Sequence, residues 1–112
     1  MPKATVIGPG FGLIAEERTR QVVEEGWTAE HDDQHKNCEL LSAVLCYLGM
    51  AASLSDDTDA GAELRDGLLR DWPWAPKWWK PSIDPVRNLV KAGALIAAEI
   101  DRILREEEKR DA

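Results

Sequence analysis

Residues 71–81 limit the possible folds of this chain more than any other stretch. They hold four of its five tryptophans, with three prolines and two lysines. Proline fixes its own φ and pushes the preceding residue toward extended geometry, so this stretch can be neither a regular helix nor a central strand. A flexible loop would leave four indoles in water, whereas buried aromatic side chains dominate the energetics of a small core or interface. We therefore expect an ordered loop whose indoles pack against helices, a partner chain or a flat ligand.

Length and charge narrow the class of protein. The 112 residues suit one domain, which we place at residues 13–112 after a flexible, turn-rich arm at residues 1–12. The arm has no apolar run long enough for a signal peptide or membrane span, so a cytoplasmic location and no membrane partner are expected. A net charge of −7 repels phosphate backbones and argues against duplex nucleic acid as a partner.

Apolar residues recur at helical spacing in three long segments, residues 13–25, 36–50 and 86–109, and in a short one, residues 63–70. Asp84 and Pro85 suit the N-cap and first position of the last helix. The sequence thus predicts an all-α fold of three main helices plus one short helix, with the tryptophan loop before the last helix and a solvated loop at residues 51–62. The last helix should bury an apolar stripe made of Leu89, Val90, Gly93, Ile96, Ala97, Ile100, Ile103 and Leu104.

The middle of that last helix is rich in alanine and glycine, between residues 92 and 98. Small side chains let another helix approach closely, and a helix from a second copy is one candidate. A homo-oligomer is therefore expected.

Both histidines of the chain lie in a segment dense in carboxylates. If residues 31–39 are helical, His31, His35 and Glu39 share one face, where imidazoles one turn apart can ligate the same ion. Asp32, Asp33 and Glu39 would suit magnesium. The alternative is structural, because Asp32 and Asp33 also fit the cap and acidic first turn of the following helix.

The chain resembles a family of short, functionally uncharacterised proteins encoded by phages and prophages. The segments that carry the resemblance are residues 25–35 (EGWTAEHDDQH), 72–81 (WPWAPKWWKP) and 89–100 (LVKAGALIAAEI). This likeness implies a genetic setting and no reaction. A looser similarity is to the all-α nucleotide pyrophosphohydrolases of the MazG type, whose helix-borne carboxylates hold magnesium; Glu39, Glu99 and Asp101 are the candidates here.

Two functions follow as hypotheses. The first is a metal-dependent nucleotide pyrophosphohydrolase, with Glu39 and His35 as catalytic residues and magnesium or another divalent metal as cofactor. Its metal ligands would be His31, Asp32, Asp33, His35, Glu39 and Glu99.

The second hypothesis is a non-catalytic phage counter-defence protein that sequesters a host nucleotide signal or binds a host protein. Indoles would stack on the ligand and cations would meet its phosphates. The ligand-binding residues would be Trp27, Trp74, Trp78, Trp79, Lys77, Lys80, Arg87 and Lys91. Both hypotheses need the indoles and the histidine–carboxylate cluster to line a common cavity. A purely structural role, in which the indoles cover the last helix, explains the tryptophans as well.

Overall fold

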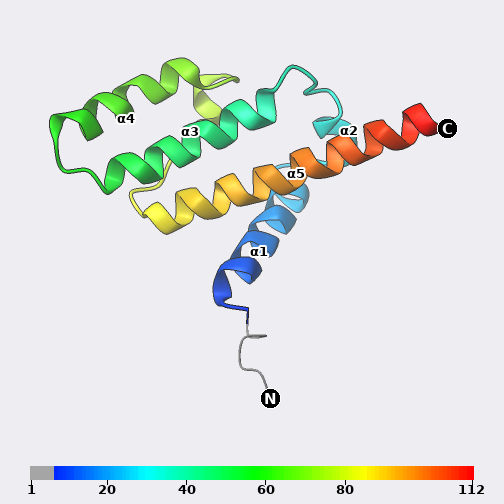
Figure 1. Cartoon of the computed structure of the whole chain (residues 1–112), viewed down its shortest axis with the longest axis horizontal. Helices are drawn as coiled ribbons and strands as arrows, with labels where there is room; N and C mark the ends of the chain where they lie inside the picture. Colours follow the sequence, from blue (N-terminus) through cyan, green and yellow to red (C-terminus); the bar gives the residue numbers. More distant parts are fainter. Residues whose placement is uncertain (1–6) are drawn as a thin grey trace.

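A computed structural model describes residues 7–112, and every regular element in this part of the chain is helical. The elements are α1 (Pro9–Val23), α2 (Ala29–Asp32), α3 (Glu39–Leu54), α4 (Asp59–Asp71), the 3-10 turn η2 (Pro76–Trp78) and α5 (Pro85–Asp111). The all-α prediction is confirmed (Figure 1). None of the helices in residues 7–112 is long and apolar enough to cross a lipid bilayer.

Several predicted boundaries are wrong. Helix α1 begins at Pro9, inside the predicted arm, because proline suits the first position of a helix; residues 1–6 lie outside the described part of the chain. Helix α3 runs on to Leu54, since the Ser53 hydroxyl donates to the carbonyl of Met50 at 2.8 Å instead of ending the helix. With α4 starting at Asp59, the predicted loop at residues 51–62 shrinks to residues 55–58.

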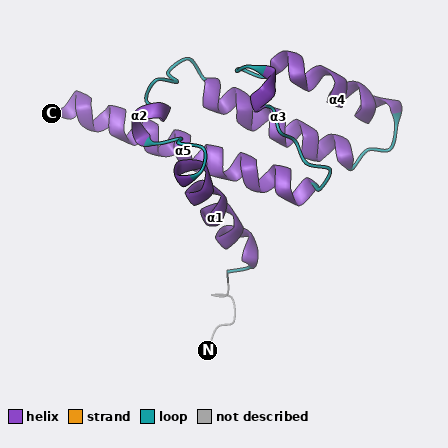
Figure 2. Cartoon of the chain, turned by 180° about the vertical axis from the view of Figure 1, so that it is seen from behind, coloured by secondary structure: helices purple, strands orange, loops and turns teal. Residues whose placement is uncertain are grey.

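Helices α3 and α5 form the centre of the fold, with α4 packed on α3 and α1 crossing α5 and projecting away from it (Figures 1 and 2). The shared core consists of Leu40, Ala43, Val44, Cys46 and Tyr47 from α3, Ala92, Leu95 and Ala98 from α5, and Trp72. Helix α3 of the same chain therefore packs on the alanine-rich strip of α5. Since this strip motivated the expected homo-oligomer, any self-association must use another surface.

The predicted apolar stripe of α5 is largely not core. Its members Leu89, Ile96, Ile100 and Ile103 are 49%, 40%, 52% and 39% exposed. Gly93 is covered by α1, because a Cβ there would lie 2.7 Å from the Cδ1 atom of Ile14. Hydrophobic periodicity predicts that a helix has an apolar face, but it does not predict which helix packs on it. Here α3 packs on a different face of α5, which carries Ala92, Leu95 and Ala98.

The tryptophan loop is ordered, as predicted, and is held by its aromatic side chains. Trp72 is 6% exposed, and its ring centroid lies 5.7 Å from that of Tyr47 on α3. Trp79 lies 4.9 Å from both of these rings. The indole nitrogen of Trp72 donates to the carbonyl of Ala75 at 3.2 Å. These contacts fix the loop on α3.

Glu17 joins α1 to α5. Its buried carboxylate accepts from Arg20 at 2.8 and 2.9 Å and from Gln21 at 3.2 Å, and it also pairs with Arg87 of α5. Burial opposes ionisation of Glu17, but hydrogen bonds from the two arginines outweigh it and lower its pKa. The charged form of Glu17 therefore stabilises the contact between these helices.

We expect Glu17→Gln to lower the free energy of unfolding by about 2 kcal/mol at pH 7. This is less than the cost of breaking a fully buried pair, because Arg20 and Arg87 are partly exposed. A lowered pKa in the folded state gives stability that is present above the usual value of 4.5 and is lost as pH falls below it. The difference between wild type and variant in urea denaturation should therefore shrink from pH 7 to pH 3. Glu16→Gln, an exposed neighbour, is the control; an equal effect of both substitutions would contradict this role.

Gly61 allows α4 to begin close to the preceding turn. A Cβ at this position would overlap the carbonyl oxygen of Asp56. Gly61→Ala should therefore destabilise the protein by about 1–3 kcal/mol, as expected for overpacking. Gly10→Ala in α1 meets no atom within 4 Å and should be neutral or stabilising by up to about 1 kcal/mol. Thermal unfolding of the two variants provides the comparison, and a stabilising Gly61→Ala would be inconsistent with the tight contact.

Candidate functional site

The turn after α1 places Trp27 in the site. Gly26 adopts a φ of +74°, which favours glycine, and the chain reverses so that the Trp27 amide donates to the carbonyl of Gln21 at 3.0 Å. Thr28 then caps α2, its hydroxyl accepting from the amide of His31 at 3.4 Å. Gly26, which directly follows the predicted helical segment of residues 13–25, thus forms the turn that brings Trp27 and His31 to one side of the fold.

Aromatic side chains from three segments line an open cavity of about 440 Å³, here called the aromatic cavity. Trp27 stacks on His31 with ring centroids 6.1 Å apart and an interplanar angle of 8°. Trp74 lies 6.3 Å from Trp27 and 5.1 Å from His35. The full lining is Glu25, Trp27, His31, His35, Trp74, Ala75 and Trp78. The indoles and histidines thus share a cavity, but the expected carboxylates Asp32, Asp33 and Glu39 do not line it, so the expectation of one cavity for indoles, histidines and carboxylates holds only in part.

The two histidines meet although they are not on one helix. Helix α2 ends at Asp32, so the expected single helical face is wrong; the turn at residues 33–38 instead brings His35 back against His31. Their Nε2 atoms are 3.4 Å apart. The Nδ1 atom of His31 lies 3.2 Å from Asp32 Oδ1, and that of His35 lies 3.2 Å from Glu39 Oε2. Each imidazole thus has a carboxylate behind it.

The other predicted metal ligands point to arginines. Asp32 is buried and pairs with Arg18 at 2.9 Å. Asp33 pairs with Arg105 at 2.8 Å, and the hydrogen bond from this guanidinium lowers its pKa. No group of three or more His, Cys, Asp or Glu side chains in residues 7–112 is arranged to hold a metal ion.

Glu99 and Glu39, two of the three candidate carboxylates of the MazG likeness, have different partners. Glu99 pairs with Arg102 one turn along α5. Burial opposes ionisation of Glu39, but hydrogen bonds from His35 and the Asn37 amide outweigh it and lower its pKa. Glu39 thus remains a charged partner of the imidazole of His35.

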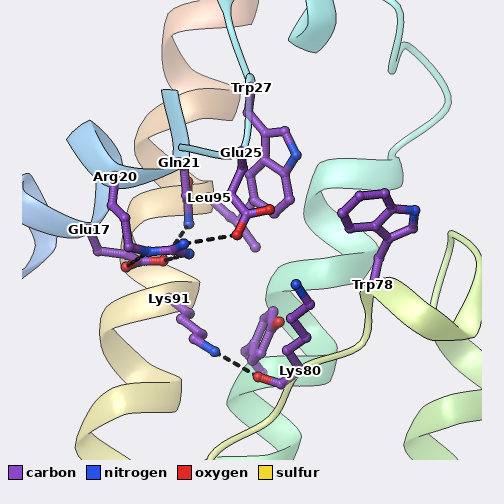
Figure 3. A pocket seen from close by; sticks show the side chains of 10 residues that line it. Glu17, Arg20, Gln21, Glu25, Trp27, Trp78, Lys80, Lys91 and Leu95 are labelled. Atoms are coloured by element: carbon purple, nitrogen blue, oxygen red, sulfur yellow. Dashed lines mark hydrogen bonds and ion pairs between the residues drawn. The ribbon is translucent and has the colours of Figure 1, made fainter. Parts of the chain in front are cut away.

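A second, smaller cavity of about 20 Å³ adjoins the aromatic cavity and is here called the polar cavity. The two share Glu25, Trp27 and Trp78 as walls. Figure 3 shows the Lys80 side chain reaching toward the space between the two indoles. The remaining lining residues are Glu17, Arg20, Gln21, Tyr47, Lys80, Lys91 and Leu95. A volume of this size holds about one water molecule.

The polar cavity contains two groups whose protonation is shifted by burial. Burial, together with the nearby Arg87 charge, lowers the pKa of Lys91, whose ammonium donates to the carbonyl of Lys80 at 2.6 Å. Burial also raises the pKa of Tyr47 to about 12, so its hydroxyl stays protonated at neutral pH. The other charged groups of this lining are Lys80 and Arg20, with the carboxylates of Glu17 and Glu25, and Arg20 pairs with both carboxylates at 2.8 Å.

Three predicted ligand-binding residues line neither cavity. Trp79 belongs to the aromatic contacts that fix the loop, and Arg87 pairs with Glu17. The Lys77 ammonium lies 5.3 Å from the ring centroid of Trp78, on which Lys80 also sits, at 5.5 Å. Sequence reasoning missed Glu25 and the α1 residues of the polar cavity. The glycine after Glu25 was the available signal, since a reversal there returns the chain toward α1.

Two buried polar atoms have no hydrogen-bond partner among residues 7–112. They are the indole nitrogen of Trp74, a wall of the aromatic cavity, and Oε1 of Gln21, a wall of the polar cavity. Buried polar groups are nearly always hydrogen-bonded, so atoms of this kind call for a water or ligand partner. Each cavity thus has one such atom in its lining residues.

We compared the chain with models of known protein families, with curated protein sequences and with solved structures. None of the three comparisons finds a match.

Proposed function

We propose that the aromatic cavity binds a small molecule with a flat, nucleobase-like ring and an anionic group. The observation that carries this proposal is the shared wall between the two cavities, where Trp27 and Trp78 stand between an aromatic space and the side chains of Lys80 and Lys91. A ring among the indoles would place an attached phosphate near Lys80. Nucleotides and nucleotide-derived molecules combine both features.

The aromatic cavity has the size and lining for a ring. Its volume of about 440 Å³ falls within the range typical of small-molecule sites. Stacking on an aromatic side chain contributes about 1–3 kcal/mol per base and accepts any base, because every base has a π-face. Glu25 and the indole N–H of Trp74 supply an acceptor and a donor for polar atoms at the edge of the ring.

The cationic groups suit a phosphate at the edge of the site. The polar cavity holds only about one water molecule, so the phosphate would lie at its opening, next to Lys80. Lys77 and Lys80 both sit over Trp78, which concentrates positive charge beside one stacking surface. In a chain of net charge −7, this local positive charge favours small anions without favouring duplex nucleic acid.

We propose binding in preference to hydrolysis because three of the carboxylates expected to hold magnesium have arginine partners. Asp32, Asp33 and Glu99 each form an ion pair. The resemblance to phage-encoded proteins would make the ligand a host nucleotide signal that the protein sequesters. His35 and Glu39 remain the residues to test if turnover is observed.

Trp78→Ala should weaken binding of nucleoside phosphates about 10-fold or more, since it removes one stacking surface. Trp78 is 41% exposed, so the fold should tolerate the change. Calorimetric titration with adenosine, guanosine and their mono- and triphosphates measures the effect, and Leu69→Ala on the exposed side of α4 is the control. Lys80→Gln should weaken the binding of triphosphates more than the binding of nucleosides, because only the triphosphates carry the anionic group. Equal affinities of wild type and both variants would contradict the proposed site.

A second experiment with the same nucleotides separates binding from hydrolysis. After incubation with the protein and magnesium, nucleotides extracted under denaturing conditions should be intact in chromatography. Turnover that disappears in Glu39→Gln would instead support the pyrophosphohydrolase hypothesis.

We also propose that the protein self-associates through the outer face of α5. Leu89, Ile96, Ile100 and Ile103 repeat at spacings of three, four and seven residues and are each 39–52% exposed. This is the spacing with which helices pack in coiled coils and bundles. The radius of gyration is 15.9 Å, against about 13 Å for a compact chain of this length, which leaves surface for a second copy to cover.

Ile100→Glu should shift the protein toward the monomer, because the charge would have to be buried at the contact. Light scattering after size exclusion reports the mass. Leu64→Glu, which changes a residue on α4 that is 43% exposed, should leave the mass unchanged. A wild type that is monomeric at high micromolar concentration would contradict self-association.

A further inference from the structure

We infer that His31 and His35 together bind one transition-metal ion of the zinc type through their Nε2 atoms, at the wall of the aromatic cavity. This inference does not depend on the nucleotide proposal. Of the metal ligands expected from the sequence, only the two histidines are kept as ligands, and the carboxylates of Asp32 and Glu39 stand behind them.

The carboxylates determine which imidazole nitrogen is free. Asp32 Oδ1 and Glu39 Oε2 each lie 3.2 Å from an Nδ1 atom. An ionised carboxylate can only accept a hydrogen bond, so each Nδ1 carries the proton. In a neutral imidazole the lone pair is then on Nε2. Both histidines are thus held in the tautomer that offers Nε2 to a metal.

The distance between the two free nitrogens fits a metal. The Nε2 atoms are 3.4 Å apart. Two nitrogens bound tetrahedrally to zinc at about 2.0–2.1 Å are separated by about 3.3–3.4 Å. Two lone pairs facing each other at this distance repel unless a cation or a proton lies between them. A metal ion satisfies both nitrogens without changing either tautomer.

The carboxylates are themselves held in place. Asp32 is buried and receives a hydrogen bond from Arg18 at 2.9 Å. Glu39 accepts from the backbone amide of Asn37 at 2.6 Å through its other oxygen. Carboxylates that hydrogen-bond the far nitrogen of a metal-binding histidine orient the ring and raise its basicity. Asp32 and Glu39 are therefore positioning residues for this site.

Two protein ligands leave coordination positions open. Because His31 and His35 line the aromatic cavity, these positions would be available to water or to a bound molecule. Imidazole ligands favour zinc, copper, nickel and cobalt, whereas magnesium prefers oxygen. The site would therefore select a metal of the first group.

The inference is tested by titrating Zn²⁺ alone into chelator-treated protein and measuring heat. We expect one equivalent to bind per chain, and His31→Ala or His35→Ala to weaken binding at least 10-fold. Cys38→Ser is the matched control, since it removes the exposed thiol of the chain, and it should bind as wild type does. His35→Gln repeats the test with a side chain of similar size, and circular dichroism checks that each variant keeps its helices.

Two further measurements distinguish a specific metal site from adventitious binding of metal ions to the protein surface. Glu39→Gln should weaken Zn²⁺ binding about 10–100-fold, as is typical when the partner of a metal-binding histidine is changed. Cu²⁺ should quench tryptophan fluorescence in wild type and not in His31→Ala, because Trp27 and Trp74 contact the two imidazoles. Failure of wild type to bind Zn²⁺, or binding unchanged in the histidine variants, would overturn the inference. In that case a proton shared between the imidazoles would account for their distance.

Discussion

The contact of Trp72 and Trp79 with Tyr47 is the interaction on which the rest of the structure depends. These three rings lie within 5.7 Å of one another, measured between centroids, in the core between α3 and the loop that follows α4. Aromatic pairs of this kind contribute beyond their buried area and favour particular angles, so they fix the loop as well as attach it. With the loop fixed, Trp74 lies against Trp72, with ring centroids 5.3 Å apart, and Trp74 and Trp78 line the aromatic cavity. The aromatic cavity is a consequence of that attachment.

Ion pairs decide which polar groups remain open to a ligand. Glu17 is shared by Arg20 and Arg87, Asp33 pairs with Arg105, and Glu99 pairs with Arg102. Because the chain is acidic, most arginines near the site already have a carboxylate partner. The lysines of the tryptophan loop and Lys91 are what remain beside the cavities. Lys80 and Lys91 therefore supply positive charge at the polar cavity of a protein whose net charge is −7.

The two cavities and the histidine pair share their walls. Trp27 contacts His31, Trp74 contacts His35, and Glu25 borders both cavities. A metal ion between the imidazoles would fix two aromatic walls of the larger cavity, and a ring bound there would lie beside the open coordination positions. Binding at one place would thus alter the free energy of binding at the other, since both would order the same side chains.

The sequence by itself determined the helical class, the ordered tryptophan loop and the start of α5. Asp84 caps that helix, accepting from the amide of Val86 at 3.0 Å, with Pro85 at its first position. These features follow from residues close together in the chain, through backbone geometry and local hydrogen bonds. Tertiary structure alone decided that Trp79 packs against the core while Trp78 lines both cavities, that Glu17 meets Arg87, and that α3 packs on the alanines of α5. Such outcomes depend on contacts between residues up to 70 positions apart, which periodicity and capping rules do not describe.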